Sequence, residues 1–245
     1  MMCLSLRPEY GGINTNEICV NICRNARRII EKRVVQVKNP WEDIRYSDYE
    51  THMSLPDVQQ LQTLSKIMES QFEQDQVQTV AILGIAGGNG LEHFDSNRIH
   101  TAYGIDVNEE YLEICRKRFS GLGDHLVLLK ADLSEPGQNI PKVDFVIANL
   151  FIEYIGIDRF AGQIRKSNAS YVSCVIQKNE GDNFVSPSPY SSVFAGISRI
   201  HRDIEAEALS ECMSRVGYLK TLSEKYKLPN QKSLIRIDFE KNNMA

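Results

Sequence analysis

The stretch from Gln78 to Phe94 places the strongest constraint on how this chain folds. Residues 80–83 form a short apolar run, which is typical of a strand buried on both faces of a sheet. Small residues then recur at every second position, namely Gly84, Ala86, Gly88 and Gly90. Residues 91–94 fit the first turns of a helix. Because a glycine-rich turn between a strand and a helix lets backbone N–H groups approach a ligand closely, the sequence predicts a binding turn here.

Three further predicted strands each carry a polar residue at or near their carboxyl end. They are expected at residues 101–106, 124–133 and 142–149, with Asp106, Asp132 and Asn149 in these places. Carboxyl ends of parallel strands meet at one edge of a sheet, so these side chains should line one crevice together with Gly84. A carboxylate after the second strand can hold two ribose hydroxyls, and one after the third can accept a hydrogen bond from an adenine amino group.

These motifs resemble those of the class I S-adenosylmethionine-dependent methyltransferases, over roughly residues 77–245. The resemblance implies an α/β fold of the Rossmann-like methyltransferase type, a doubly wound, mostly parallel seven-stranded sheet with helices on both faces and a reversed last strand. It implies S-adenosyl-L-methionine as the cofactor, bound by the residues that match the family's motifs: Gly84, Ala86, Gly88, Gly90, Asp106, Val107, Asp132, Leu133 and Asn149.

Two positions depart from the family's pattern. Ile82 stands where the family usually carries an acid, two residues before the first glycine, and Ala86 replaces a customary glycine. The sequence therefore leaves open which group binds the methionyl ammonium of the cofactor. It also leaves open a non-catalytic protein of the same fold that binds the cofactor only to sense it or to hold a partner.

The connector at residues 40–56 concentrates aromatic and other large side chains, namely Trp41, Tyr46, Tyr49, His52 and Met53. In several small-molecule methyltransferases a segment before the first strand folds over the cofactor as a lid. By this analogy Tyr49 and Met53, with Tyr46, would cover the sulfonium, while His52 or Glu50 would meet the acceptor. A hydrophobic plug with aromatic anchors is the other interpretation. We expect residues 1–75 to be a helical extension with this lid, and residues 76–245 to be the cofactor-binding core.

The remaining elements follow from hydrophobic periodicity and turn residues. Helices are expected at residues 14–33, with one basic side, and at 56–74, 109–119, 157–166 and 200–216; a strand is expected at 169–177 and a closing hairpin at 218–226 and 233–239. The loop at residues 179–192 follows a strand's carboxyl end, where loops are often functional, so it is the candidate for acceptor selection.

Methyl transfer is an in-line displacement that depends mainly on alignment and exclusion of water. Four side chains are candidates for a place near the transferred methyl, without a ranking among them: Glu153, Tyr154, His201 and His52. Six cysteines are scattered without a Cys-x-x-Cys pair, so reduced structural thiols are expected and no metal site is predicted.

The net charge and the distribution of apolar residues limit the kinds of partner that the chain is expected to bind. The net charge is −4, which gives no overall attraction to nucleic acid or an acidic membrane. Without a membrane-length apolar run or a signal-peptide pattern, the expected location is cytoplasmic. A small-molecule acceptor is therefore predicted, and the oligomeric state is left open.

Two competing enzyme classes fit less well. A short-chain NAD(P)-dependent oxidoreductase would match Gly84, Gly88 and Gly90, but no tyrosine in the chain has the lysine four residues later that these enzymes need. Methyltransferases of nucleic-acid amines often carry Asn/Asp-Pro-Pro-Tyr after the fourth strand, whereas residues 149–152 contain no proline.

Overall fold

The structure is a computed structural model that describes residues 38–181 and 183–242. The chain divides into two units, Met1–Lys38 and Asn39–Ala245, and all that follows concerns the second. This unit holds the expected lid segment together with the core. The helix expected at residues 14–33 lies outside the described residues. No helix among the described residues is long and apolar enough to cross a membrane.

The described part of the unit is built on a seven-stranded sheet in the order β3-β2-β1-β4-β5-β7-β6. The strands are β1 (Thr79–Leu83), β2 (Thr101–Asp106), β3 (Leu126–Lys130), β4 (Phe145–Asn149), β5 (Tyr171–Lys178), β6 (Tyr218–Lys227) and β7 (Ser233–Lys241). The first five strands pair in parallel, and β7 pairs antiparallel to both β5 and β6. The predicted fold class, with its reversed last strand between the fifth and sixth, is confirmed.

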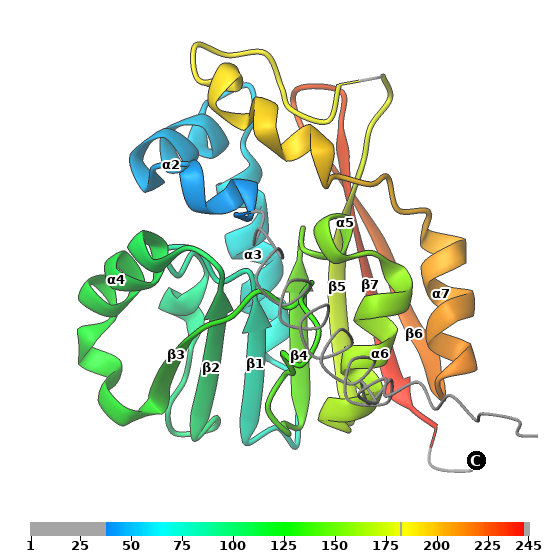
Figure 1. Ribbon diagram of the computed structural model, residues 1–245. Helices are drawn as coiled ribbons and strands as arrows, with labels where there is room; N and C mark the ends of the chain where they lie inside the picture. Colours follow the sequence, from blue (N-terminus) through cyan, green and yellow to red (C-terminus); the bar gives the residue numbers. More distant parts are fainter. Residues whose placement is uncertain (1–37, 182, 243–245) are drawn as a thin grey trace, which may run out of the picture. The chain divides into compact units, whose positions relative to one another are not determined.

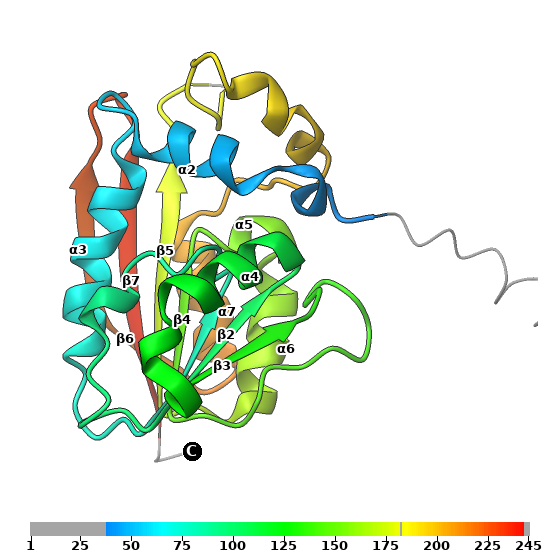
Figure 2. The same ribbon diagram turned by 90° about the vertical axis from the view of Figure 1, so that its left-hand side faces the viewer.

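Helices cover both faces of the sheet (Figures 1 and 2). They are α3 (Gln60–Phe72), α4 (Glu109–Arg118), α5 (Ile152–Ile155), α6 (Ile157–Ser167) and α7 (Ala206–Arg215). Side chains of α3 and α4 form one apolar cluster with Val80 and Ile82 of β1. The neighbouring residues Ala81 and Leu83 point to the other face, into a cluster with α5, α6 and α7. This alternation explains why β1 is apolar throughout, because a strand covered on both faces has no polar side.

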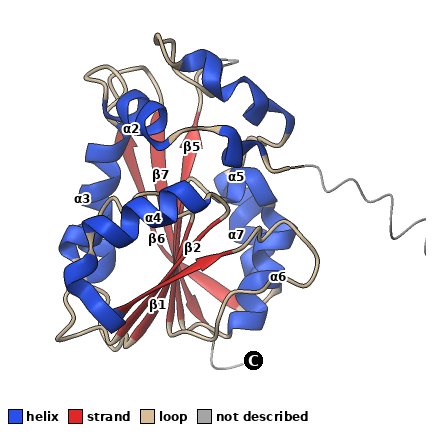
Figure 3. Cartoon of the chain, turned by 60° about the vertical axis from the view of Figure 1, so that its left-hand side comes forward, coloured by secondary structure: helices blue, strands red, loops and turns tan. Residues whose placement is uncertain are grey.

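Three short elements lie beyond the carboxyl ends of the parallel strands: the 3-10 helix η1 (Pro40–Asp43), the helix α2 (Tyr46–Ser54) and the 3-10 segment η4 (Ser191–Arg199). Figures 1 and 3 show α2 and η4 above this edge of the sheet. Ile44, which lies between η1 and α2, forms a small apolar cluster with Phe194 and Ile197 of η4. This cluster joins the segment from η1 to α2 to the segment η4. The edge where the polar strand ends were predicted to meet is therefore roofed by two segments distant in sequence.

Three predicted helix boundaries are wrong. Only one 3-10 turn, η2 (Leu91–His93), follows the glycine loop, because Phe94 already has extended backbone angles. Helix α3 begins at Gln60 rather than near Pro56, since Gln59 adopts a left-handed conformation with φ of 49°. Helix α7 begins at Ala206 rather than Ile200, because Glu205 is still extended.

Candidate functional site

A pocket opens at the carboxyl edge of the parallel strands, where the order of the strands reverses between β1 and β4. Ligands of doubly wound folds bind at such a switch point. The lining holds thirteen of the predicted site residues: Gly84, Ala86, Asp106, Val107, Asp132, Leu133, Asn149, Tyr49, Met53, His52, Glu153, Tyr154 and His201. The structure thus brings together side chains that the sequence spreads over about 150 positions.

Gly88 and Gly90 do not line the pocket, although both were predicted to bind the cofactor. Their φ angles are +87° and +92°, and a Cβ on Gly88 would meet Phe119 while one on Gly90 would meet Met68. The lack of a side chain at these two positions therefore lets the loop pack closely against Phe119, just after α4, and Met68 of α3. Gly84, by contrast, is exposed toward the pocket and has a φ of +67°, which favours glycine.

Asp106 is held firmly at the end of β2. Its Oδ2 accepts a hydrogen bond from the Ala86 N–H and its Oδ1 accepts one from the Asn108 N–H, each 2.9 Å long. The side chain is only 8% exposed. Burial raises the pKa of Asp106 to about 6, although these backbone N–H groups act in the opposite direction. The carboxylate therefore stays ionised at neutral pH while lying in the pocket wall.

Asp132 lies just beyond β3 and is held by Asn39, a residue that the sequence did not single out. The Asn39 side-chain amide donates to Oδ2 of Asp132 at 2.8 Å. The other oxygen, Oδ1, accepts from the backbone N–H and hydroxyl of Ser134. Both Asn39 and Asp132 line the pocket.

Asn149 ends β4, and its side-chain amide is paired with that of Gln71 on α3. Each amide donates to the oxygen of the other, at 2.9 and 3.0 Å. Gln71 is fully buried and also donates to Ser173. Ile82 is buried in the apolar cluster of this face and lines the pocket as well, so no carboxylate stands at the family's acidic position.

Glu153 lies on α5, immediately after β4, and is 2% exposed. Its Oε1 accepts a hydrogen bond from the Gln177 N–H at 2.9 Å, whereas Oε2 has no partner among the described residues. Burial raises the pKa of Glu153 to about 7. Burial also raises the pKa of the neighbouring Tyr154 well above its ordinary value.

The segment from η1 to α2 covers the pocket with aromatic rings. Trp41 meets the ring of Tyr154 edge to face, with 5.1 Å between ring centroids, and Tyr49 packs against Tyr111 at 5.4 Å. Asn108 anchors this segment, because its side-chain amide donates to the carbonyl oxygens of Trp41 and Ile44. The position of Asn108 as the N-cap of α4 was the only signal that the sequence offered for it.

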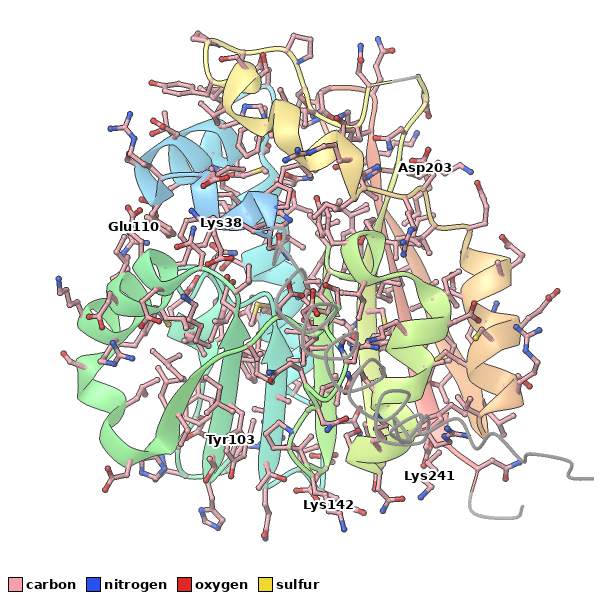
Figure 4. The ribbon with its side chains drawn as sticks, viewed as in Figure 1. Lys38, Tyr103, Glu110, Lys142, Asp203 and Lys241 are labelled. Carbon is pink, nitrogen blue, oxygen red and sulfur yellow. The ribbon has the colours of Figure 1, made fainter. Side chains whose placement is uncertain are left out.

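Helix α2 is also joined to α4 at the surface. Arg118 forms hydrogen bonds with the carboxylate of Glu50, at 2.6 and 2.9 Å, and with the hydroxyl of Tyr46. The Tyr46 N–H lies 3.3 Å from Oε1 of Glu110, which Figure 4 labels at the start of α4. Tyr46 itself does not line the pocket, and Glu50 is likewise turned to α4 rather than to an acceptor.

The two candidate histidines, one on α2 and one just after η4, each pack against a phenylalanine ring. His52 contacts the hydroxyl of Ser188 through Nδ1 at 2.7 Å, and its ring packs on Phe194. The ring of His201 stacks on Phe184 with 4.0 Å between centroids. Burial lowers the pKa of both imidazoles, so both are uncharged at neutral pH. The loop predicted to select the acceptor contributes Phe184, Val185 and Ser186 to the lining.

No protein-family model and no curated protein sequence matches the chain. Solved structures do match it, including the cyclase SpnF, with a TM-score of 0.56 and 13% identity over 74% of this chain and 81% of that one. Magnesium protoporphyrin IX methyltransferase from Synechocystis PCC 6803, with bound S-adenosylmethionine, has a TM-score of 0.52 and 11% identity over 75% and 79%.

Phosphoethanolamine N-methyltransferase 2 from Haemonchus contortus has a TM-score of 0.60 and 11% identity, over 81% of this chain and 57% of that one. At such low identity these likenesses establish the fold and not the activity. The strand order and the three structural matches lead to the same conclusion: the chain has the fold of the class I S-adenosylmethionine-dependent methyltransferases.

Proposed function

We propose that this pocket binds S-adenosyl-L-methionine and that the protein transfers the methyl group to a small-molecule acceptor. One observation carries the proposal. Among the described residues, two buried side-chain atoms lack a hydrogen-bond partner, the Tyr111 hydroxyl and Oε2 of Glu153, and both residues line this pocket. Buried polar atoms in folded proteins nearly always have partners, so the pocket is suited to a ligand with polar groups on both sides.

Asp106 is the residue that would hold the ribose. A carboxylate offers about four acceptor sites, and two of those on Asp106 are used by backbone N–H groups. The backbone N–H of Val107 also lies close enough to lower the pKa of Asp106, and the acceptor capacity that remains would serve the ribose hydroxyls. Burial is the main cause that raises the pKa of Tyr111 well above its ordinary value, and the negative charge of nearby Asp106 adds to it. This side of the pocket therefore matches the sugar of the cofactor.

The adenine and methionyl ends would lie on either side of the ribose. Asp132 and Leu133, beyond β3, are the groups for the adenine, with Asn39 holding the carboxylate. Gly84 leaves the backbone open to the methionyl part. We assign the ammonium to Oδ1 of Asn149, which keeps an acceptor site beside its bond from Gln71. In this assignment Asn149 does the work of the acid that the family usually carries at the position of Ile82.

When bound, S-adenosyl-L-methionine supplies a methyl group on a sulfonium, which carries most of the reactivity. The protein's own residues then have to align the acceptor and keep water away. Trp41, whose carbonyl oxygen is bound by Asn108, and Tyr49 line the pocket and are suited to the second task. A non-catalytic protein that only binds the cofactor stays the alternative, because Ile82 weakens the match to the family; detectable methyl transfer would exclude it.

The experiment that tests the proposal is isothermal titration of the protein with S-adenosylhomocysteine, with NADH and NADPH in parallel. We expect micromolar binding of S-adenosylhomocysteine and no binding of either nicotinamide cofactor. Binding of a nicotinamide cofactor instead, or of none of the three, would overturn the cofactor assignment.

A further inference from the structure

The pocket has two sides with different residues, one on either side of the point where the strand order reverses. Asp106 and Asp132 follow β2 and β3, on one side of the switch point between β1 and β4. Glu153 follows β4 and is fastened to β5 on the other side. The proposed ribose and adenine positions occupy the first side, and the proposed methionyl position lies at Asn149, where β4 ends. The region beyond β4 toward β5 is therefore left for the acceptor.

Glu153 is fixed in place by contacts that leave one oxygen unused. Its Oε1 is bound by the Gln177 N–H, and its backbone carbonyl accepts a hydrogen bond from the Arg202 N–H at 2.9 Å. Its neighbours Ile152 and Ile155 are buried in the core and hold α5 against the sheet. Oε2 therefore belongs to a fixed residue of the pocket lining, has no partner among the described residues and exposes less than 1 Å² of its own surface, so a ligand group reaches it by displacing a neighbouring side chain.

The pocket lining around Glu153 is mainly aromatic. The lining on this side includes Phe151, Tyr154, Phe184, Phe194 and His201. Among the described residues, no lysine or arginine lines the pocket at all. The nearby ammonium of Lys232 is bound to the Phe184 carbonyl, and burial lowers the pKa of Lys232 to about 8. The positive charge of Lys232 adds to burial in lowering the pKa of His52 and His201, but Lys232 is not part of the lining. A phosphate or carboxylate on the acceptor would thus find acids and rings in the lining itself, with the ammonium of Lys232 already bound to a carbonyl oxygen.

From this geometry we propose that Oε2 of Glu153 binds the nucleophile of the acceptor, and that the acceptor is an uncharged, ring-bearing molecule with an amine N–H or a hydroxyl O–H. This inference rests on the proposed function and names its acceptor class. Glu153 is then distinguished from the other three candidates. His52 is already engaged with Ser188, His201 is stacked on Phe184, and Tyr154 is held against Trp41.

In the methyl transfer that follows, the electron pair and the proton each have a destination within the pocket. Glu153 accepts a hydrogen bond from the N–H or O–H, which aims a lone pair of that nitrogen or oxygen at the methyl carbon. As the new bond to carbon forms, the electron pair of the broken carbon–sulfur bond stays on sulfur. Oε2 of Glu153 takes the proton that the nitrogen or oxygen loses. The raised pKa of Glu153 suits a group that must hold a proton near neutral pH.

Four matched ring compounds test the proposal: para-cresol, para-toluidine, para-xylene and para-toluate. They share one ring size and present an O–H, an N–H, a methyl group and a carboxylate. At about pH 8 the toluidine is uncharged and Glu153 is ionised. We would titrate each compound into the protein saturated with S-adenosylhomocysteine, and into the ligand-free protein. The cresol and the toluidine separate an oxygen acceptor from a nitrogen acceptor.

The wild-type protein should bind the cresol, the toluidine or both roughly tenfold or more tightly than the xylene, as expected for a hydrogen bond to a charged group. It should not bind the toluate. Glu153→Gln should abolish this preference, because the amide oxygen keeps the bond from Gln177 and an NH₂ donor then replaces the free oxygen. Glu205→Gln is the matched control, since Glu205 is exposed, pairs with Lys178 and lies outside the lining.

Tight binding of the xylene, binding of the toluate, or a preference that survives Glu153→Gln would overturn the proposal. So would the absence of binding by every probe. The cofactor assignment is read separately from the titration with S-adenosylhomocysteine. If that ligand fails to bind while the ligand-free protein shows a preference that depends on Glu153, the proposed function falls and the role of Glu153 as a donor-binding group remains.

Discussion

Asp106 and Glu153 are both buried carboxylates in the wall of one pocket, yet their oxygens are used differently. Each oxygen of Asp106 accepts a backbone hydrogen bond, whereas Glu153 has one bound and one unpartnered oxygen. The pKa is raised to about 6 for Asp106 and to about 7 for Glu153, in both cases mainly by burial. The difference that matters is therefore in the hydrogen bonds: under the proposed function Asp106, with both oxygens fixed, would hold the ribose, and Glu153, with one unpartnered oxygen, would receive the acceptor.

The largest effect should come from removing the charge of Glu153. Its pKa in the folded protein is above its ordinary value of 4.5, so the folded state binds more protons than the unfolded state between about pH 4.5 and 7. The free energy of unfolding must therefore fall as pH rises through this window. Glu153→Gln should lose this fall, which we put at about 3 kcal/mol for the single group. Denaturant unfolding at a series of pH values measures it, and parallel curves for variant and wild type would contradict the burial argument.

Asp106→Ala should weaken binding of S-adenosylhomocysteine by about 1–3 kcal/mol, or roughly 5- to 150-fold, because buried ribose hydroxyls would lose their acceptor. Glu153→Gln should change this affinity by no more than about twofold, since it acts on the acceptor side. Asp75→Ala, at an exposed carboxylate that is not part of the pocket lining, is the control. Equal losses for the variants at 106 and 153 would break the comparison between the two acids. Isothermal titration decides between the outcomes.

Gly90→Ala should affect the fold and neither acid. The φ of +92° and the close side chain of Met68 make any Cβ at this position unfavourable. We expect the free energy of unfolding to fall by about 1–3 kcal/mol, while the affinity for S-adenosylhomocysteine stays within about twofold in the folded variant. A large loss of affinity without a loss of stability would mean that Gly90 does contribute to cofactor binding, as the sequence predicted.

The smallest effect is expected at the contact between α2 and α4. Glu50→Gln removes the ion pair with Arg118, whose two side chains are 36% and 42% exposed. Stability should fall by less than about 1 kcal/mol, as is usual for such pairs. If α2 opens to admit the cofactor, Glu50→Gln should also raise the dissociation rate of S-adenosylhomocysteine. The factor of this increase should exceed the factor that corresponds to the lost free energy of unfolding. Stopped-flow measurements give the dissociation rate. An unchanged rate would show that the ion pair between Glu50 and Arg118 has no part in ligand entry or release.

The sequence predicted the sheet well, because buried parallel strands are continuous apolar runs bounded by polar or glycine residues. The positions of Gly84, Asp106 and Asn149 followed from the same pattern. The roles of Gly88 and Gly90 could not be read in this way, because a glycine that makes room for Phe119 or Met68 looks the same as one that approaches a ligand. Contacts such as Asn39 with Asp132 join residues 93 positions apart and leave no local signal.

The ranking of the catalytic candidates was also beyond the sequence. Glu153, Tyr154, His52 and His201 are four polar side chains near aromatic residues, and only the three-dimensional structure shows which atoms are already bound. The free oxygen of Glu153 depends on a single N–H from β5, that of Gln177, which supplies a bond to Oε1 and not to Oε2.

The most direct test of the account is the pKa of Asp106, measured by carbon NMR of the labelled carboxyl groups with and without S-adenosylhomocysteine. In the free protein we expect a pKa of about 6. Because two ribose hydroxyls would donate to the ionised form, binding should lower this pKa by about one unit or more and leave that of Glu153 nearly unchanged. An unmoved pKa of Asp106 in the saturated complex, or a shift confined to Glu153, would contradict the assignment of the ribose to Asp106.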